Sequence, residues 1–363
     1  MYPNFENCKY FDYPQIANYS IMGFIQQFRP DVGIVDPLSI NITMSTQQWQ
    51  TNIDKKLEQY PIVFLFLVEG EILVLDDQEK IDLLNSYTDS PVYLITQLDS
   101  FCQQTLTYTL GITCKILELP WMVTNEVMCW HLLGKQLELE NIEGPDTNFV
   151  CFIGRNEWFK TLLAESLVEK FSHNGEVYFM DHPENYKYVP KISPIPNYTK
   201  LPSMTQLPEY VNDANACSRN LISNGKATMN TLNYAKLIKF CDKVPLIIHP
   251  ESTTGVFCTT EKTMWPVLAG KLQLTFGRPY NYAYLMQFIE TDYSNIFDLS
   301  FDTIEAWDQD AVKEKLEIML ESNRYQIKHA PDVYQQHKNS LETDKINIVK
   351  NMYNFFVRQL NSV

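Results

Sequence analysis

Short apolar runs alternate with amphipathic stretches along the first third of the chain. The apolar runs span residues 32–36, 62–68, 92–96 and 115–119, and the amphipathic stretches span residues 47–59, 79–87 and 100–110. Short runs that are apolar throughout are typical of buried parallel strands. Their alternation with helical stretches predicts a doubly wound parallel sheet.

A polar stretch at residues 141–148, which holds Gly144 and Pro145, separates this part from a second part with the same rhythm. In the second part we predict strands at residues 149–153, 177–180, 246–248 and 272–276, and a long loop at residues 186–207. We predict helices at residues 157–171, 232–240, 310–321 and 341–360, and a further helix that contains residues 263–268. The sequence therefore predicts an α/β fold with two Rossmann-like domains facing a cleft. Ligands of such open sheets bind beyond the carboxyl ends of the strands.

Composition narrows the classes of function. Hydrophobic residues make up 45% of the 363 residues, enough for two cores. The formal net charge is -15, from 29 Lys+Arg and 44 Asp+Glu, and this argues against broad, non-specific binding to duplex nucleic acid. The eight cysteines are scattered and form no C-x-x-C pair, so we expect buried free thiols. With no signal peptide and no membrane-spanning apolar run, we expect no membrane partner and a cytoplasmic location, in the host cytoplasm if the protein is viral.

Residues 245–301 carry the most chemical information. A strand delivers Glu251 and Ser252 to the edge of the cleft. After a polar loop, Thr259 or Thr260 is a good N-cap for a helix that begins with Glu261 and Lys262. The N-terminus of a helix offers free N–H groups and partial positive charge, which suit a diphosphate, and Lys262 adds a full charge. Pro266 predicts that this helix is short or kinked.

This segment resembles the C-terminal domain of fucosyltransferase-like glycosyltransferases with the GT-B architecture. The family pattern runs E-S, then T-E-K-x-x-x-P, and residues 251–271 read ESTTGVFCTTEKTMWPVLAGK. The resemblance covers roughly residues 148–305 and is close over residues 247–302. The chain departs from the family at Phe288 and Ile289, where a Gly-Phe pair is usual.

The resemblance implies that residues 1–145 form an acceptor-side domain, residues 146–330 bind a nucleotide-diphosphate sugar, and residues 331–363 form a helix that crosses back to the first domain. It assigns the ribose to Glu261 and the diphosphate to Lys262. Four further residues are implied around the donor: Ser252, Thr260, Arg155 and Lys160. It also implies that neither a metal nor a cofactor is needed, with the nucleotide sugar as co-substrate.

Several other polar residues are candidates with weaker support. Transfer with inversion needs a base, and Asp36, Glu69 and Asp99 lie at or near the ends of strands in the first domain, where each can equally be a turn or cap residue. Of these we favour Glu69 and Asp99, because they follow the most buried-looking strands. Transfer with retention needs no protein base. We expect His249 to be a satisfied residue at a strand end, and Tyr280, Tyr282 and Tyr284 to pack in the core.

Three functions stay open at this stage. The first is a glycosyltransferase acting on a glycan or a small molecule. The second is a phage or viral glycosyltransferase that modifies hydroxymethylated pyrimidines in DNA, for which the Asn-, Ile- and Tyr-rich composition is the only support. The third is an inactive module that binds a nucleotide or a partner.

Overall fold

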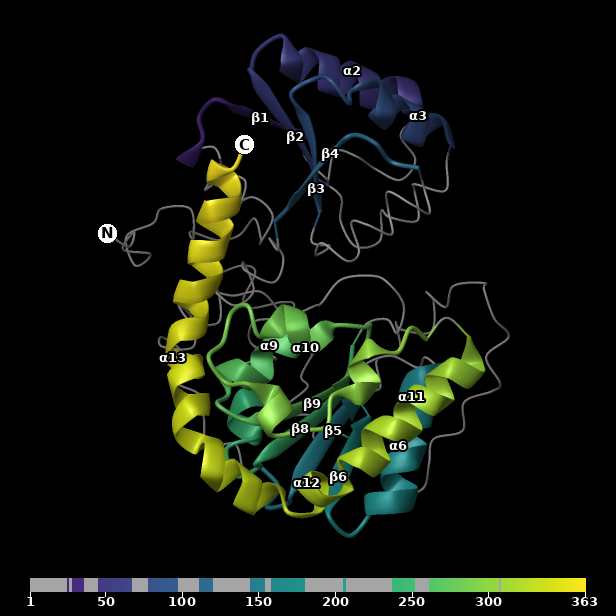
Figure 1. Ribbon diagram of the computed structural model, residues 1–363, viewed down its shortest axis with the longest axis vertical. Helices are drawn as coiled ribbons and strands as arrows, with labels where there is room; N and C mark the ends of the chain where they lie inside the picture. The colour runs from purple at the N-terminus through teal and green to yellow at the C-terminus, as the bar shows by residue number, and fades with distance from the viewer. Residues whose placement is uncertain are drawn as a thin grey trace. The chain divides into compact units, whose positions relative to one another are not determined.

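The computed structural model describes residues 25, 28–35, 45–66, 78–96, 111–119, 144–153, 158–179, 205–206, 237–251, 261–306 and 308–363. These residues belong to two units (Figure 1). Unit 1 holds the described residues up to Leu119 together with Met352–Val363, and unit 2 holds those from Gly144 to Asn351. Each unit is built around its own parallel sheet. The predicted domain limits at residues 145 and 330 stay predictions.

Unit 1 contains a sheet of four parallel strands in the order β1-β2-β3-β4. Its elements are β1 (Val32–Val35), α2 (Thr46–Leu57), β2 (Ile62–Phe66), α3 (Gln78–Ser86), β3 (Val92–Thr96) and β4 (Lys115–Glu118). Helix α2 begins with a capping box, in which Ser45 and Gln48 bond each other's backbone N–H groups.

The two faces of this sheet have separate hydrophobic cores, because successive side chains of a strand point to opposite faces. Val63 and Leu65 of β2 pack with Trp49 of α2 on one face. Phe64 packs on the other face with Phe356 and Leu360 near the C-terminus. The last turns of the C-terminal helix are therefore part of the core of unit 1, as the predicted fold requires.

Unit 2 contains a sheet of five parallel strands in the order β7-β6-β5-β8-β9. The strands are β5 (Phe149–Ile153), β6 (Gly175–Phe179), β7 (Thr205–Gln206), β8 (Leu246–Pro250) and β9 (Leu272–Phe276). The helices include α6 (Trp158–Phe171), α9 (Glu261–Leu268), α10 (Asn281–Leu285), α11 (Gln309–Ser322), α12 (Arg324–Lys328) and α13 (Ala330–Asn361), with short 3₁₀ turns at Tyr293–Asn295 and Ser300–Thr303. Residues 237–240, within the helix predicted at 232–240, are also helical. Every residue of β5, β8 and β9 is buried.

Helices cover this second sheet from both sides. Helices α6 and α11 lie together on one side, joined by ion pairs from Lys170 to Glu317 and Glu321, and α13 passes on the other side (Figure 1). Asp344 of α13 accepts hydrogen bonds from the N–H groups of Glu290 (2.6 Å) and Thr291 (3.2 Å). One long helix thus contributes side chains to unit 2 in its first part and to the core of unit 1 at its end.

The structure confirms the predicted α/β fold with parallel sheets and corrects three local predictions. Strand β7 lies within residues 186–207, which were expected to be loop throughout, and α13 begins at Ala330 rather than at residue 341. Tyr282 and Tyr284 are buried as expected, but Tyr280 is 37% exposed and has a left-handed backbone, with φ of 58°. The helix expected at residues 100–110 lies outside the described residues. None of the described helices is both long enough and apolar enough to cross a membrane.

Candidate functional site

In unit 2 the direction in which successive strands are added to the sheet reverses between β5 and β8. After β5 the chain moves outward to β6, and β8 then returns to pair with the opposite side of β5. At such a switch point the connections leave in opposite directions, so the carboxyl ends of the two central strands border an open crevice, where ligands of parallel α/β sheets bind. Glu251 follows β8 directly, and α9 begins at Glu261 on the same edge.

Glu251 is fixed by hydrogen bonds at this edge. Its N–H donates to the carbonyl of Phe276 on β9 (2.8 Å), and its side chain is only 1% exposed. The hydroxyl of Thr263, in the first turn of α9, donates to the carboxylate of Glu251. The amide Nδ2 of Asn281 in turn donates to the hydroxyl of Thr263 (3.3 Å). The starts of α9 and α10 are thus joined to the end of β8.

His249 lies two residues before Glu251 and is buried. Burial, with a contribution from the charge of Lys262, lowers the pKa of the imidazole to about 3, so the ring is neutral at pH 7. Its Nε2 lies 3.3 Å from the hydroxyl of Thr275. The same hydroxyl lies 3.4 Å from Oε1 of Gln273.

The other ring nitrogen of His249 is Nδ1. It is buried, and no partner for it exists among the described residues. The expectation of a fully satisfied histidine is therefore wrong for one of its two nitrogens. A buried polar atom without a partner is uncommon and costly, so it points to a group that approaches this edge of the sheet.

Lys262 supplies the positive charge of the site. It lies in the first turn of α9, is partly buried, and is close enough to His249 to lower the pKa of that ring. Helix α9 has eight residues and contains Pro266, as predicted for a short helix. The N–H groups in the first turn of a helix have no acceptor within the helix, and together with the Lys262 ammonium they suit an anion such as a diphosphate.

Three buried charged residues lie on the same side of unit 2. Asp302 accepts hydrogen bonds from the N–H groups of Asn281 (3.2 Å) and Tyr282 (3.0 Å), and so holds the first turn of α10. Burial raises the pKa of Asp302 to about 6, against the opposing effect of the Lys315 charge. Burial also lowers the pKa of Lys315, to about 8. The guanidinium of Arg278 packs over the ring of Tyr284, with its central carbon 5.4 Å from the ring centre. These contacts stabilise the loop after β9.

The predicted site residues are only partly within the described residues. Those that lie outside are Glu69, Asp99, Arg155, Ser252 and Thr260. Glu261 is the first residue of α9, and only its backbone is described. Lys160 is buried in the first turn of α6, with its ammonium 5.3 Å from the ring of Phe159. Their roles in binding and catalysis stay predictions.

Two residues were not singled out from the sequence as contributors to this edge. Thr263 and Asn281 join α9 and α10 to Glu251, and neither stands in a motif that marks it. In the sequence, the one feature that could have pointed to them is that both lie in the first turn of a helix that follows a buried strand. Among the described residues, no group of three or more His, Cys, Asp or Glu side chains is placed to hold a metal ion.

Comparisons with known proteins give structural similarity and no match in sequence. No family model matches the chain, and no curated protein matches it. The fold is similar to that of HepE from Anabaena, solved in complex with UDP-glucose, over 95% of this chain and 82% of that one, with 12% identity and a TM-score of 0.43. It is also similar to sucrose-phosphate synthase from Thermosynechococcus elongatus, over 86% of this chain and 77% of that one, with 8% identity and a TM-score of 0.34. Similarity at this level does not establish a reaction, so the function is argued from the residues.

Proposed function

We propose that the protein is a glycosyltransferase that takes a sugar from a nucleotide-diphosphate donor bound at the carboxyl edge of the sheet in unit 2. The observation that carries this proposal is the position of Lys262 in the first turn of α9, beside the neutral His249 and the anchored Glu251. The diphosphate would bind Lys262 and N–H groups in the first turn of α9. The proposal needs no metal, because these groups supply positive charge next to the leaving group.

The ribose of the donor would bind Glu261, by its position in the T-E-K segment. Ser252 and Thr260 would line the same pocket, with Arg155 and Lys160 as further candidates near the phosphates. The unpartnered Nδ1 of His249 supports a ligand at this edge, because an approaching hydroxyl group would satisfy it.

The transfer step follows from this placement. The acceptor hydroxyl oxygen attacks the anomeric carbon, the bond from that carbon to the diphosphate oxygen breaks, and the nucleoside diphosphate leaves with the electron pair. Lys262 would stabilise the charge that develops on the diphosphate. For transfer with inversion, Glu69 or Asp99 is our candidate to take the proton from the acceptor.

A ligand panel tests the proposal. The thermal midpoint of the protein would be measured with UDP, GDP, ADP, CMP and their sugars, since a ligand that binds only the folded state raises the midpoint. We expect one nucleotide and its sugar to raise it. No shift with any of them would contradict the transferase and favour an interaction module. After a positive result, glycans, small molecules and hydroxymethylated DNA would be compared as acceptors.

A further inference from the structure

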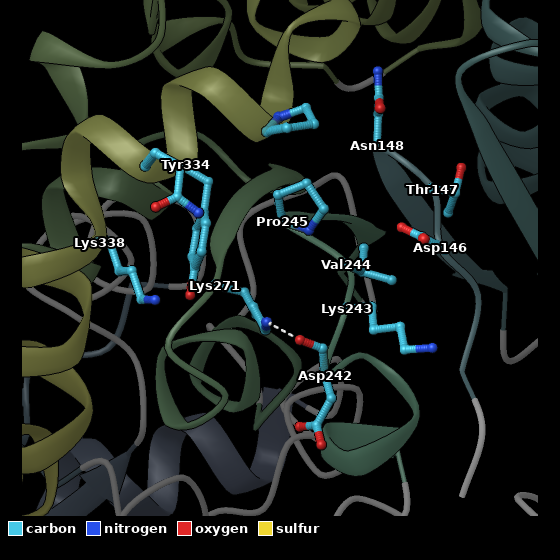
Figure 2. Close-up of a pocket in the computed structure, with 12 residues that line it drawn as sticks. Asp146, Thr147, Asn148, Asp242, Lys243, Val244, Pro245, Lys271, Tyr334 and Lys338 are labelled. Carbon is cyan, nitrogen blue, oxygen red and sulfur yellow. Dashed lines mark hydrogen bonds between the residues drawn. The ribbon is translucent and has the colours of Figure 1, made fainter.

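A pocket of about 360 Å³ lies at the opposite edge of the five-stranded sheet. Its walls are residues directly before β5 and β8, Lys271 directly before β9, and the first turns of α13 (Figure 2). This volume falls within the range of pockets that hold small molecules, about 300–1,000 Å³. Strand β8 runs from this edge to the candidate donor site, a length of roughly 13 Å at 3.3 Å per residue. A ligand here is therefore separate from one at Lys262.

Lys271 gives the pocket a buried positive charge. The residue is 7% exposed, and its ammonium donates to the backbone carbonyl of Asp242 (2.8 Å) and lies 5.2 Å from the ring of Tyr334. Burial lowers its pKa, and this effect outweighs the nearby carboxylates of Asp242 and Glu342. Among the described residues no carboxylate forms an ion pair with it. A buried ammonium with neutral partners is costly, and an anion in the pocket would offset that cost.

The other charges around the pocket also favour an anion. Lys243 and Lys338 are exposed at its rim, and neither pairs with a carboxylate in the described part of the chain. Of the two acidic residues in the wall, Asp242 already pairs with Lys239 at 2.6 Å, and Asp146 is exposed. Lysines thus outnumber uncompensated carboxylates here, although the whole chain has a net charge of -15.

We propose that this pocket binds the phosphate group of a small phosphorylated compound, held by Lys271, Lys338 and the hydroxyl of Tyr334. Figure 2 shows these three residues on one side of the pocket and Asp146 and Thr147 on the other. A phosphate has the charge and the acceptor oxygens to bond two ammonium groups and a hydroxyl. Asp146 can then accept a hydrogen bond from a hydroxyl group of the rest of the ligand. The Thr147 hydroxyl already donates to the carbonyl of Asn174 (3.0 Å), so it can serve only as a further acceptor. The proposal does not depend on glycosyl transfer.

Calorimetric titration of the Lys262→Ala variant tests the site without interference from the donor edge. The probes are glucose 6-phosphate, inorganic phosphate and glucose. We expect both phosphates to bind and glucose not to bind. Tighter binding of glucose 6-phosphate would identify a phosphate ester as the ligand, and equal binding would identify free phosphate.

Substitutions in the same background locate the binding. We expect Lys338→Glu to weaken glucose 6-phosphate binding by roughly tenfold or more, and Lys271→Met to abolish it. Lys338 is exposed, so its variant is informative even if replacing the buried Lys271 prevents folding. The control Lys313→Glu, on the exposed side of α11, should bind as before. Absence of phosphate binding up to millimolar concentration, unchanged affinity in the Lys338 variant, or equal binding of glucose would overturn the proposal.

Discussion

The hydroxyl of Thr263 donates a hydrogen bond to the buried carboxylate of Glu251, and this bond joins the first turn of α9 to the end of β8. The N–H of Glu251 bonds to β9 through Phe276. Helix α9 is therefore fixed to two adjacent strands at the residue where the candidate donor site begins. The position of Lys262, next to Thr263 in sequence, depends on this connection.

Replacing Thr263 with valine keeps the shape of the side chain and removes the donor. We expect Thr263→Val to lower the free energy of unfolding by about 1–3 kcal/mol, because a buried carboxylate loses a partner. Urea denaturation measures this change. The control is Thr303→Val, an exposed threonine whose hydroxyl bonds the carbonyl of Ser300, and it should change stability by less than about 0.5 kcal/mol. Equal effects of the two substitutions would contradict the role assigned to Thr263.

The buried imidazole of His249 makes stability depend on pH. In the unfolded chain the imidazole takes a proton near pH 6.5, whereas in the folded protein burial holds its pKa at about 3. As pH falls from 6.5 towards 3 the unfolded state therefore binds more protons, and the free energy of unfolding decreases. The contribution of this one group is at most about 1.4 kcal/mol per pH unit.

His249→Gln should remove that contribution, because glutamine does not titrate. Denaturation of the wild type and the variant at several pH values between 3 and 7 gives the difference in slope. His173→Gln, at an exposed histidine after α6, should leave the wild-type slope unchanged. Parallel slopes for the wild type and the His249 variant would show that the imidazole is not held neutral by burial.

Asp344 connects α13 to the backbone after α10. Its carboxylate accepts from the N–H groups of Glu290 and Thr291, and the residue is 1% exposed. We expect Asp344→Ala to cost about 2–4 kcal/mol, because two amides lose a charged acceptor. Hydrogen exchange should show faster exchange at these two amides. The control is Asn339→Ala, at an exposed position of the same helix, which should leave the exchange of these two amides unchanged. Unchanged exchange in the Asp344 variant would contradict the role assigned to Asp344.

The sequence predicts the buried strands of this protein well. The predicted limits of β3, β5 and β9 agree with the structure at both ends. Each is a run that is apolar or β-branched for nearly its whole length, because both faces of a parallel sheet are covered. Strand β7 was not predicted, because its two residues, Thr205 and Gln206, are too few to form an apolar run. It is held by backbone pairing with β6.

Helix α13 shows where periodicity stops being informative. Its first turns carry mostly polar residues, since of residues 330–340 only Ala330 and Val333 are buried, so no apolar stripe marks the start. Ile346 lies within the helix predicted at residues 341–360 and is apolar, yet it is 70% exposed. It lies two residues from the buried Ile348, which places it about 200° around the helix.

The site was predictable only in outline. The T-E-K segment predicted that Lys262 lies in the first turn of a short helix after a buried strand, and the structure has it there. The partners of Glu251 come from α9 and from Asn281, and their meeting depends on tertiary packing. The same holds for Lys315, which lies in a helix of charged residues and is fully buried near Asp302. Local sequence does not reveal such pairs.

Equilibrium binding of the donor nucleotide to substituted proteins tests the proposed function most directly. The nucleotide that gives the largest thermal shift would be titrated into the wild type, Lys262→Ala, Glu261→Ala and the control Lys313→Ala, with circular dichroism to confirm folding. We expect the Lys262 and Glu261 substitutions each to weaken binding by roughly tenfold or more, through loss of a charged hydrogen bond, and the control to bind like the wild type. Wild-type affinity in both the Lys262 and the Glu261 variants would contradict a donor site at the start of α9.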